Sequence, residues 1–191
     1  VPVDIYMVDD LEESAKKNDH RLLLLILPGL IKICLLHCSC IFTISPGFSE
    51  HLKLRYNIES VPLFLPHPIP PKKICPYNAQ KNKTRKVTFI GALNFLYESS
   101  LILLYNIILS HNDKYPDQPL NLQIVTYSNP SAFTNKLPNF TACSIYQNVD
   151  HKILSEMLNA SWAVLLPYSF EDAEKIMVQT SFSCKILEYF Q

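Results

Sequence analysis

The stretch that decides the fold runs from Val87 to Tyr127 and reads VTFIGALNFLYESSLILLYNIILSHNDKYPDQPLNLQIVTY. It opens with a short β-prone run, Val87 to Ile90, which ends on a glycine. A nearly all-apolar helical segment, Leu101 to Leu109, follows a pair of serines that suit an N-cap, and Leu120 to Tyr127 supplies another β-prone run. A strand, a helix and a strand in this order predict a βαβ unit with parallel strands.

Toward the C-terminus the same alternation continues. Ala142 to Tyr146 is expected to be a strand, and Asp150 is expected to cap a helix with one apolar stripe. Trp162 to Leu166 is the next expected strand, and Ser183 to Phe190 opens a further apolar-faced helix. A parallel unit needs that helix to return to another strand, so we expect the chain to end inside a unit.

Toward the N-terminus the pattern predicts three strands and two helical segments, the first of them in one piece or divided at Pro28-Gly29. The strands are expected at Val3 to Val8, Cys40 to Ile44 and Val61 to Leu65, and the helical segments at Glu12 to Leu36 and Ser49 to Tyr56. This alternation predicts a second parallel sheet flanked by helices.

The fold class expected for the whole chain is therefore α/β, with Rossmann-like parallel sheets and flanking helices. Prolines and a polar, basic run crowd the region between the two series of elements. We therefore expect residues 1–70 to be the C-terminal part of one domain, residues 71–86 to be a linker, and residues 87–191 to be a second, incomplete domain.

Composition excludes several classes of function. Hydrophobic residues make up 48% of the 191 residues, which is far from the composition of disordered chains, and Lys plus Arg equals Asp plus Glu at 17 each, so no net charge attracts nucleic acid. The three glycines cannot form a dinucleotide or P-loop motif. Cys34, Cys38 and Cys40, with His37 and His51, lack a usual zinc spacing, so we favour buried reduced thiols over a metal site.

The longest apolar run is short for a membrane span. Leu22 to Ile31 holds ten residues, including Pro28 and Gly29, before Lys32 interrupts it, whereas a span needs about 18. We expect a buried or interfacial helix. A membrane-associated segment that continues to Phe42 stays open as an alternative.

Candidate ligand-binding residues gather where the strands of the second half end, because open α/β folds bind ligands at the carboxyl edge of their sheets. Hydroxyls and amides at a helix start suit a diphosphate, a lysine in the first turn adds positive charge, and a glutamate one turn later can accept hydrogen bonds from a ribose. The same pattern also fits an ordinary capped helix. The candidates are Gly91, Tyr168, Ser169, Glu171, Ser181, Ser183, Lys185 and Glu188.

The order of these landmarks resembles that of GT-B glycosyltransferases, chiefly the group that contains the retaining family 4 enzymes. The stretches that carry the resemblance are Phe42-Thr43-Ile44-Ser45, Glu50 to Tyr56, Val61 to Pro66, Val87 to Gly91, Trp162 to Tyr168, and Ser183 to Tyr189. The resemblance implies two Rossmann-like domains that face a cleft, a nucleotide-sugar donor held mainly by the second domain, and no obligatory metal.

Carried over by residue, the resemblance implies that Glu188 binds the ribose, Ser183 meets the diphosphate, and Glu171 is the catalytic carboxylate near the donor sugar. The chain departs from the family pattern in two places: Glu171-Asp172-Ala173-Glu174 replaces a glycine-rich stretch, and Asn94 to Ser100 contains no basic residue. We also expect the first strands of the N-terminal domain and the part after Gln191 to be missing, and with them acceptor-binding and some catalytic groups, so the fragment is expected to be inactive as given.

Several expectations follow for the parent protein. Its acceptor is a glycan, a lipid or a small molecule, and its location is the cytoplasm, with the inner face of the membrane as an alternative. Two other readings stay open: a non-catalytic two-lobed α/β protein that binds a small ligand, and a relative that kept the fold and lost catalysis.

Overall fold

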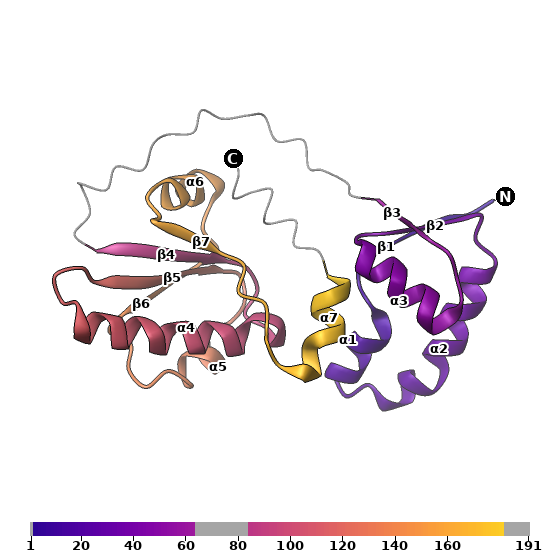
Figure 1. The fold of residues 1–191 in the computed structure, drawn as a ribbon, viewed down its shortest axis with the longest axis horizontal. Coiled ribbons are helices and arrows are strands. Elements are labelled where there is room, and N and C mark those ends of the chain that lie inside the picture. Colours follow the sequence, from indigo (N-terminus) through magenta and orange to yellow (C-terminus); the bar gives the residue numbers. More distant parts are fainter. Residues whose placement is uncertain (1, 64–83, 182–191) are drawn as a thin grey trace. The chain divides into compact units, whose positions relative to one another are not determined.

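The computed structural model describes residues 2–63 and 84–181. It confirms the α/β class, with two sheets of parallel strands flanked by helices (Figure 1). The described residues form two compact units, the first made of residues 2–63 and 172–181 and the second of residues 84–171. Most of the predicted linker lies outside the described residues.

The first unit is a three-stranded parallel sheet in the order β1-β2-β3, with Ile5 of β1 opposite Ile41 of β2. Its core joins Ile41 to Leu35 and to Phe48 and Leu52 of the helix that follows β2. Its elements up to residue 63 are β1 (Asp4–Met7), α1 (Leu11–Lys17), α2 (Arg21–Leu36), β2 (Cys40–Thr43), α3 (Pro46–Tyr56) and β3 (Val61–Pro62).

The break in the first helical segment lies elsewhere than at the predicted Pro28-Gly29. Pro28 is inside α2, and the chain turns between α1 and α2, where Asp19 takes a left-handed φ of 54°. Asn18 supports this turn, because its side-chain amide donates to Ser14 O at 2.8 Å. The prediction of a break at Pro28 was wrong because a local polar turn ends α1 at Lys17, eleven residues earlier.

Residues 172–181 group with the first unit, although the sequence placed them with the second domain. They form a short 3₁₀ turn, Asp172–Glu174, and α7 (Lys175–Thr180). Ser45 Oγ accepts from Phe48 N at 3.1 Å and donates to Thr180 O at 2.8 Å, which joins the first turn of α3 to the last turn of α7. The positive end of one helix thus faces the negative end of the other.

The second unit is a four-stranded parallel sheet in the order β6-β5-β4-β7. Figure 1 shows α4 on one side of this sheet and α6 on the other. Its elements are β4 (Arg85–Ile90), α4 (Phe95–Lys114), β5 (Leu120–Thr126), α5 (Ser131–Thr134), β6 (Cys143–Gln147), α6 (His151–Asn159) and β7 (Ala163–Leu165).

The core of the second unit lies between the sheet and α4. Alternate residues of β4 and β5 point to α4, and its inner face supplies residues at helical spacing. The fully buried side chains in this layer are Phe89, Leu101, Tyr105, Ile108, Leu122, Ile124 and Phe133. The hydroxyl of Tyr105 donates to Asn139 O at 2.6 Å, which satisfies the one polar atom of this buried ring.

Two elements of the second unit begin earlier than predicted. α4 begins at Phe95 rather than Leu101, because Asn94 Oδ1 accepts from Leu96 N at 3.1 Å and serves as the N-cap. β4 begins at Arg85 rather than Val87, where it pairs with Leu120 of β5. Both differences arise from hydrogen bonds that an apolar pattern does not reveal.

Candidate functional site

The strand order of the second sheet creates a switch point between β4 and β7. From β4 the chain proceeds outward to β5 and then β6, and it then returns to place β7 on the opposite side of β4. The connection from β4 to β5 and the connection from β6 to β7 therefore run in opposite directions along the sheet. Open α/β sheets bind ligands in the crevice that such a reversal leaves at this edge.

The turn that follows β4 forms one side of this switch point. Gly91 is buried at the end of the strand, and its N–H donates to Val125 O at 2.9 Å. Leu93 N donates to Ser128 Oγ at 3.2 Å, which ties this turn to the loop after β5. The turn leads directly into α4, a helix of 20 residues whose N-terminus lies at the carboxyl edge.

The segment that follows β7 forms the other side, and two of its residues anchor it to α4. The ring of Tyr168 packs against Tyr97 with 5.4 Å between ring centroids, and its carbonyl accepts from Ser100 Oγ at 2.8 Å. Ser169 N donates to Leu96 O at 2.7 Å. Ser100, which the sequence suggested as an N-cap, holds this loop instead.

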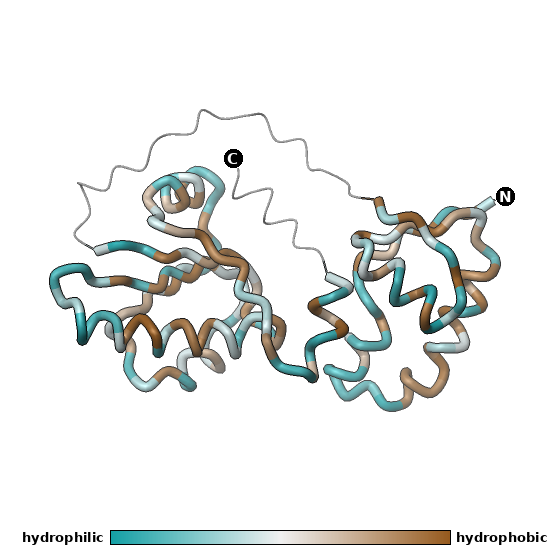
Figure 2. The backbone as a smooth tube through the Cα atoms, viewed as in Figure 1, coloured by the Kyte–Doolittle hydropathy of each residue, from teal (hydrophilic) through white to brown (hydrophobic). Residues whose placement is uncertain are grey.

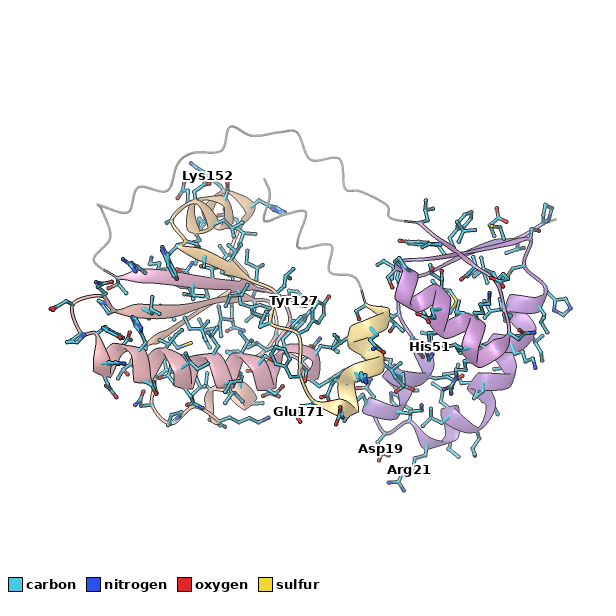
Figure 3. All side chains as sticks on the ribbon, in the orientation of Figure 1. Asp19, Arg21, His51, Tyr127, Lys152 and Glu171 are labelled. Carbon is cyan, nitrogen blue, oxygen red and sulfur yellow. The ribbon has the colours of Figure 1, made fainter. Side chains whose placement is uncertain are left out.

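The anchored loop presents a carboxylate. Ser169 is buried, its hydroxyl lies 3.1 Å from Ser99 Oγ, and it accepts from Glu171 N at 3.1 Å. Glu171 itself is exposed (Figure 3). The loop is therefore held by Tyr168 and Ser169 through packing and hydrogen bonds, while the side chain of Glu171 extends into solvent.

Gly91 follows β4 at the carboxyl edge of the second sheet, Tyr168 and Ser169 lie against the first turns of α4, and Glu171 follows in the same loop. Ser181 belongs to the first unit, where it is the C-cap of α7. The other candidates, Ser183, Lys185 and Glu188, lie outside the described residues. Within residues 2–63 and 84–181, no three His, Cys, Asp or Glu side chains gather into a metal-binding group.

One residue at this edge was missed by the sequence reading. Tyr127 follows β5 and is 74% exposed, and Figure 3 shows it at the same end of the sheet as Glu171. Beside it, Gln147 Nε2 donates to Ser128 O at 3.0 Å and links the ends of β6 and β5. The signal was present in the sequence, since an aromatic residue followed by a Ser-Asn-Pro turn directly ends a strand.

A second group of polar residues lies in the first unit, after β1. Asp10 Oδ1 caps α1 by accepting from Glu12 N and Glu13 N, both at 3.0 Å. Its Oδ2 lies 2.8 Å from His51 Nε2, which is an ion-pair distance, although the ring N–H lacks the alignment of a hydrogen bond. This contact joins the start of α1 to α3.

Glu12 holds the same two helices together from a buried position. Its carboxylate accepts hydrogen bonds from Arg55 and from the hydroxyl of Tyr56, both near the end of α3. Burial, with the hydrogen bond to Glu12, raises the pKa of Tyr56 to about 12. Because these groups hydrogen-bond with one another, we interpret the cluster as a structural contact between α1 and α3 rather than a reactive centre.

The thiol of Cys143 is buried in the core of the second unit. Burial raises its pKa to about 12, so the thiolate is scarce. This leaves the switch point of the second sheet as the candidate functional site.

Comparison with known proteins does not place the chain in a family. A scan against protein-family models finds no match, and a search of curated proteins finds no significant match.

Proposed function

We propose that the second unit binds the nucleoside diphosphate of a sugar donor at the switch point between β4 and β7, as part of a GT-B glycosyltransferase. The observation that carries this proposal is the meeting of two connections at one carboxyl edge: the turn from Gly91 into α4, and the anchored loop that ends at Glu171. The order of sequence landmarks supports the same class of protein.

The proposed chemistry is the transfer of a sugar from its nucleotide to an acceptor. The diphosphate leaves with negative charge, so it needs hydrogen-bond donors that are already in place. The start of α4 brings the positive end of its helix dipole to this edge, and in this proposal Lys185 and Ser183 supply the donors. Glu188 accepts hydrogen bonds from the ribose, and Glu171 contacts the donor sugar.

The anchoring of the loop after β7 fits this role. A carboxylate that contacts a sugar must keep its position while the neighbouring bond breaks. The buried hydroxyl of Ser169 and the packed ring of Tyr168 fix the backbone that leads to Glu171. In this proposal Tyr168 and Ser169 act through the loop and do not touch the donor.

Calorimetry of the chain with uridine, guanosine and adenosine diphosphates tests the proposal. We expect saturable binding of at least one of them, because each nucleotide carries the diphosphate that the site is proposed to hold. Glu188→Gln should weaken that binding by about tenfold, the usual cost of losing hydrogen bonds to a charged group. If none of the three nucleotides binds, the donor site is refuted.

Glu171 is tested by comparing the bound nucleotide with its sugar conjugate. Glu171→Gln should weaken binding of the nucleotide sugar by about tenfold and leave the free diphosphate unchanged, because the carboxylate contacts only the sugar. Glu156→Gln on α6 is a matched control, since this glutamate is also exposed in the second unit. Equal effects of both variants would remove Glu171 from the site.

A further inference from the structure

Helix α2 has two apolar stripes on different sides. The inner stripe consists of Leu24, Leu27, Ile31 and Leu35, which are half-buried or buried, and Ile31 and Leu35 contact the core of the first unit. The outer stripe consists of Leu22, Leu25, Ile26, Leu30, Ile33 and Leu36, all exposed. Helical spacing of three and four residues relates the members within each stripe.

The outer stripe is unusual for a helix on the surface of a domain. Such helices carry polar residues on the side away from the core, and a helix that is apolar all round is normally covered. Leu22 is 83% exposed and Leu25 is 80% exposed, so nothing in the described chain covers them. Figure 2 shows the apolar character along α2. The outer stripe therefore needs a partner outside the described residues.

We propose that the outer stripe of α2 docks in the plane of an anionic lipid bilayer. The charges of the helix favour this partner: within Arg21–Leu36 the charged residues are Arg21 and Lys32, both exposed, and the segment contains no acidic residue. Arg21 Nε donates to Asp19 Oδ1 at 2.8 Å just before the helix, so Lys32 carries the cation that this exposed pair does not compensate. Apolar side chains that enter the acyl region, with cationic side chains at the level of the headgroups, are the arrangement of interfacial helices.

The chemistry of the stripe favours lipid over a protein partner. Protein interfaces contain about one hydrogen bond per 100–200 Å² and draw most of their affinity from Trp, Tyr and Arg. The outer stripe is made only of Leu and Ile, which can make no side-chain hydrogen bond and offer no aromatic anchor. Lipid hydrocarbon has no hydrogen-bonding groups, so contact with a face of Leu and Ile leaves no polar group of either partner unpaired.

The length of α2 sets how it meets the bilayer. Its 16 residues extend about 24 Å, which is less than the roughly 30 Å of the hydrocarbon core. In the described ranges, no helix combines the length and the apolar character that a span requires. The inner stripe is held against the first unit. α2 therefore lies along the surface and inserts one side.

Vesicle sedimentation tests this proposal with the 191-residue chain. Vesicles of phosphatidylcholine and phosphatidylglycerol in equal parts should bind the chain, and pure phosphatidylcholine should bind it less. Replacing Leu22 and Leu25 together by serine should lower binding to the mixed vesicles at least about tenfold, because two apolar side chains no longer leave water. Added salt should weaken binding through Arg21 and Lys32.

The control is Leu54→Ser on α3, because Leu54 is also 80% exposed in the first unit but lies outside the stripe. It should bind as the unchanged chain does. Leu36→Ser, at the other end of the outer stripe, provides a second variant should the double replacement fail to fold. Absence of vesicle binding, or an equal loss with Leu54→Ser, would overturn the proposal. So would a dimer in solution that the stripe variants dissociate, since a second copy would then cover the stripe.

Discussion

At the scale of single residues, Tyr56 and Glu12 show how the first unit joins helices that are distant in the sequence. Glu12 lies in the first turn of α1 and is buried, which would be costly for an unpaired carboxylate. Arg55 and Tyr56 donate to its two oxygens. The carboxylate is thus tolerated because the end of α3 supplies its hydrogen bonds.

Tyr56 makes the stability of the first unit fall as the pH rises in the alkaline range. Its pKa is raised from 10 to about 12, so the folded state resists ionisation. The contribution is complete below about pH 10 and is lost as the pH rises through about 12. A pKa difference of two corresponds to about 2.7 kcal/mol in the free energy of unfolding. Solvent screening of the partly exposed ring reduces this to about 1 kcal/mol.

Urea unfolding at several alkaline pH values measures this effect. The advantage of the unchanged chain over Tyr56→Phe should shrink by about 1 kcal/mol between pH 10 and pH 12, because phenylalanine cannot ionise. Tyr115→Phe, a replacement at an exposed tyrosine of the second unit, serves as the comparison. A constant difference across this range would contradict the prediction.

At the scale of elements, two helical glycines have opposite surroundings. A Cβ built on Gly47, in the first turn of α3, would lie 2.1 Å from the backbone oxygen of Gln179 in α7. A Cβ built on Gly29 of α2 would have no atom within 4 Å. The close approach of α7 to α3 therefore depends on the missing side chain at position 47, and nothing comparable holds at position 29.

This contrast predicts opposite effects of the same replacement. Gly29→Ala should stabilise the first unit by about 0.5–1 kcal/mol, because alanine favours the helix. Gly47→Ala should destabilise it by about 1–3 kcal/mol despite the same gain in propensity, because the backbone of α7 must shift. Thermal unfolding checks both signs.

Hydrogen exchange of α7 supplies a local check on the second variant. Faster exchange in residues 175–180 of Gly47→Ala would show that α7 is displaced. Unchanged exchange together with higher stability would mean that the contact with Gln179 is not maintained in solution.

At the scale of the whole molecule, the two proposed activities belong to different units. The outer stripe of α2 is in the first unit, and the switch point is in the second. The serine replacements of Leu22 and Leu25 should therefore lower vesicle binding at least about tenfold and leave the affinity for the nucleoside diphosphate within about twofold, as calorimetry would measure. A parallel loss of both activities would show that the replacements act on the fold rather than on a surface.

Much of the fold was predictable because its causes are local. A β-prone run beside a helical apolar pattern depends on neighbouring residues, so the strands near Val87, Leu120 and Trp162 were found to within a few residues. Helix boundaries were less predictable. The caps at Asn94 and Asp10 consist of one and two hydrogen bonds that a side-chain oxygen accepts from backbone amides, and many other polar positions in the sequence could have made such bonds equally well.

The candidate site was predictable as a region and not as an arrangement. That Gly91 and Tyr168 to Glu171 follow strands was evident from the pattern, and parallel strands bring such residues to one edge. The roles of the loop residues required the structure, because Tyr168 and Ser169 are held by Tyr97, Leu96 and Ser99 of α4. Those contacts join positions about seventy residues apart, and no local pattern encodes them.

Local patterning was therefore enough to establish an α/β chain with two parallel sheets, since strand and helix periods arise within a few residues. Tertiary structure alone established three further features: β7 lies beside β4, residues 172–181 belong to the first unit, and the outer stripe of α2 is exposed. Each of these features depends on which parts of the chain, distant in sequence, pack together and exclude water. That choice is made by burial and pairing across the whole chain, and the order of residues along it does not reveal the result.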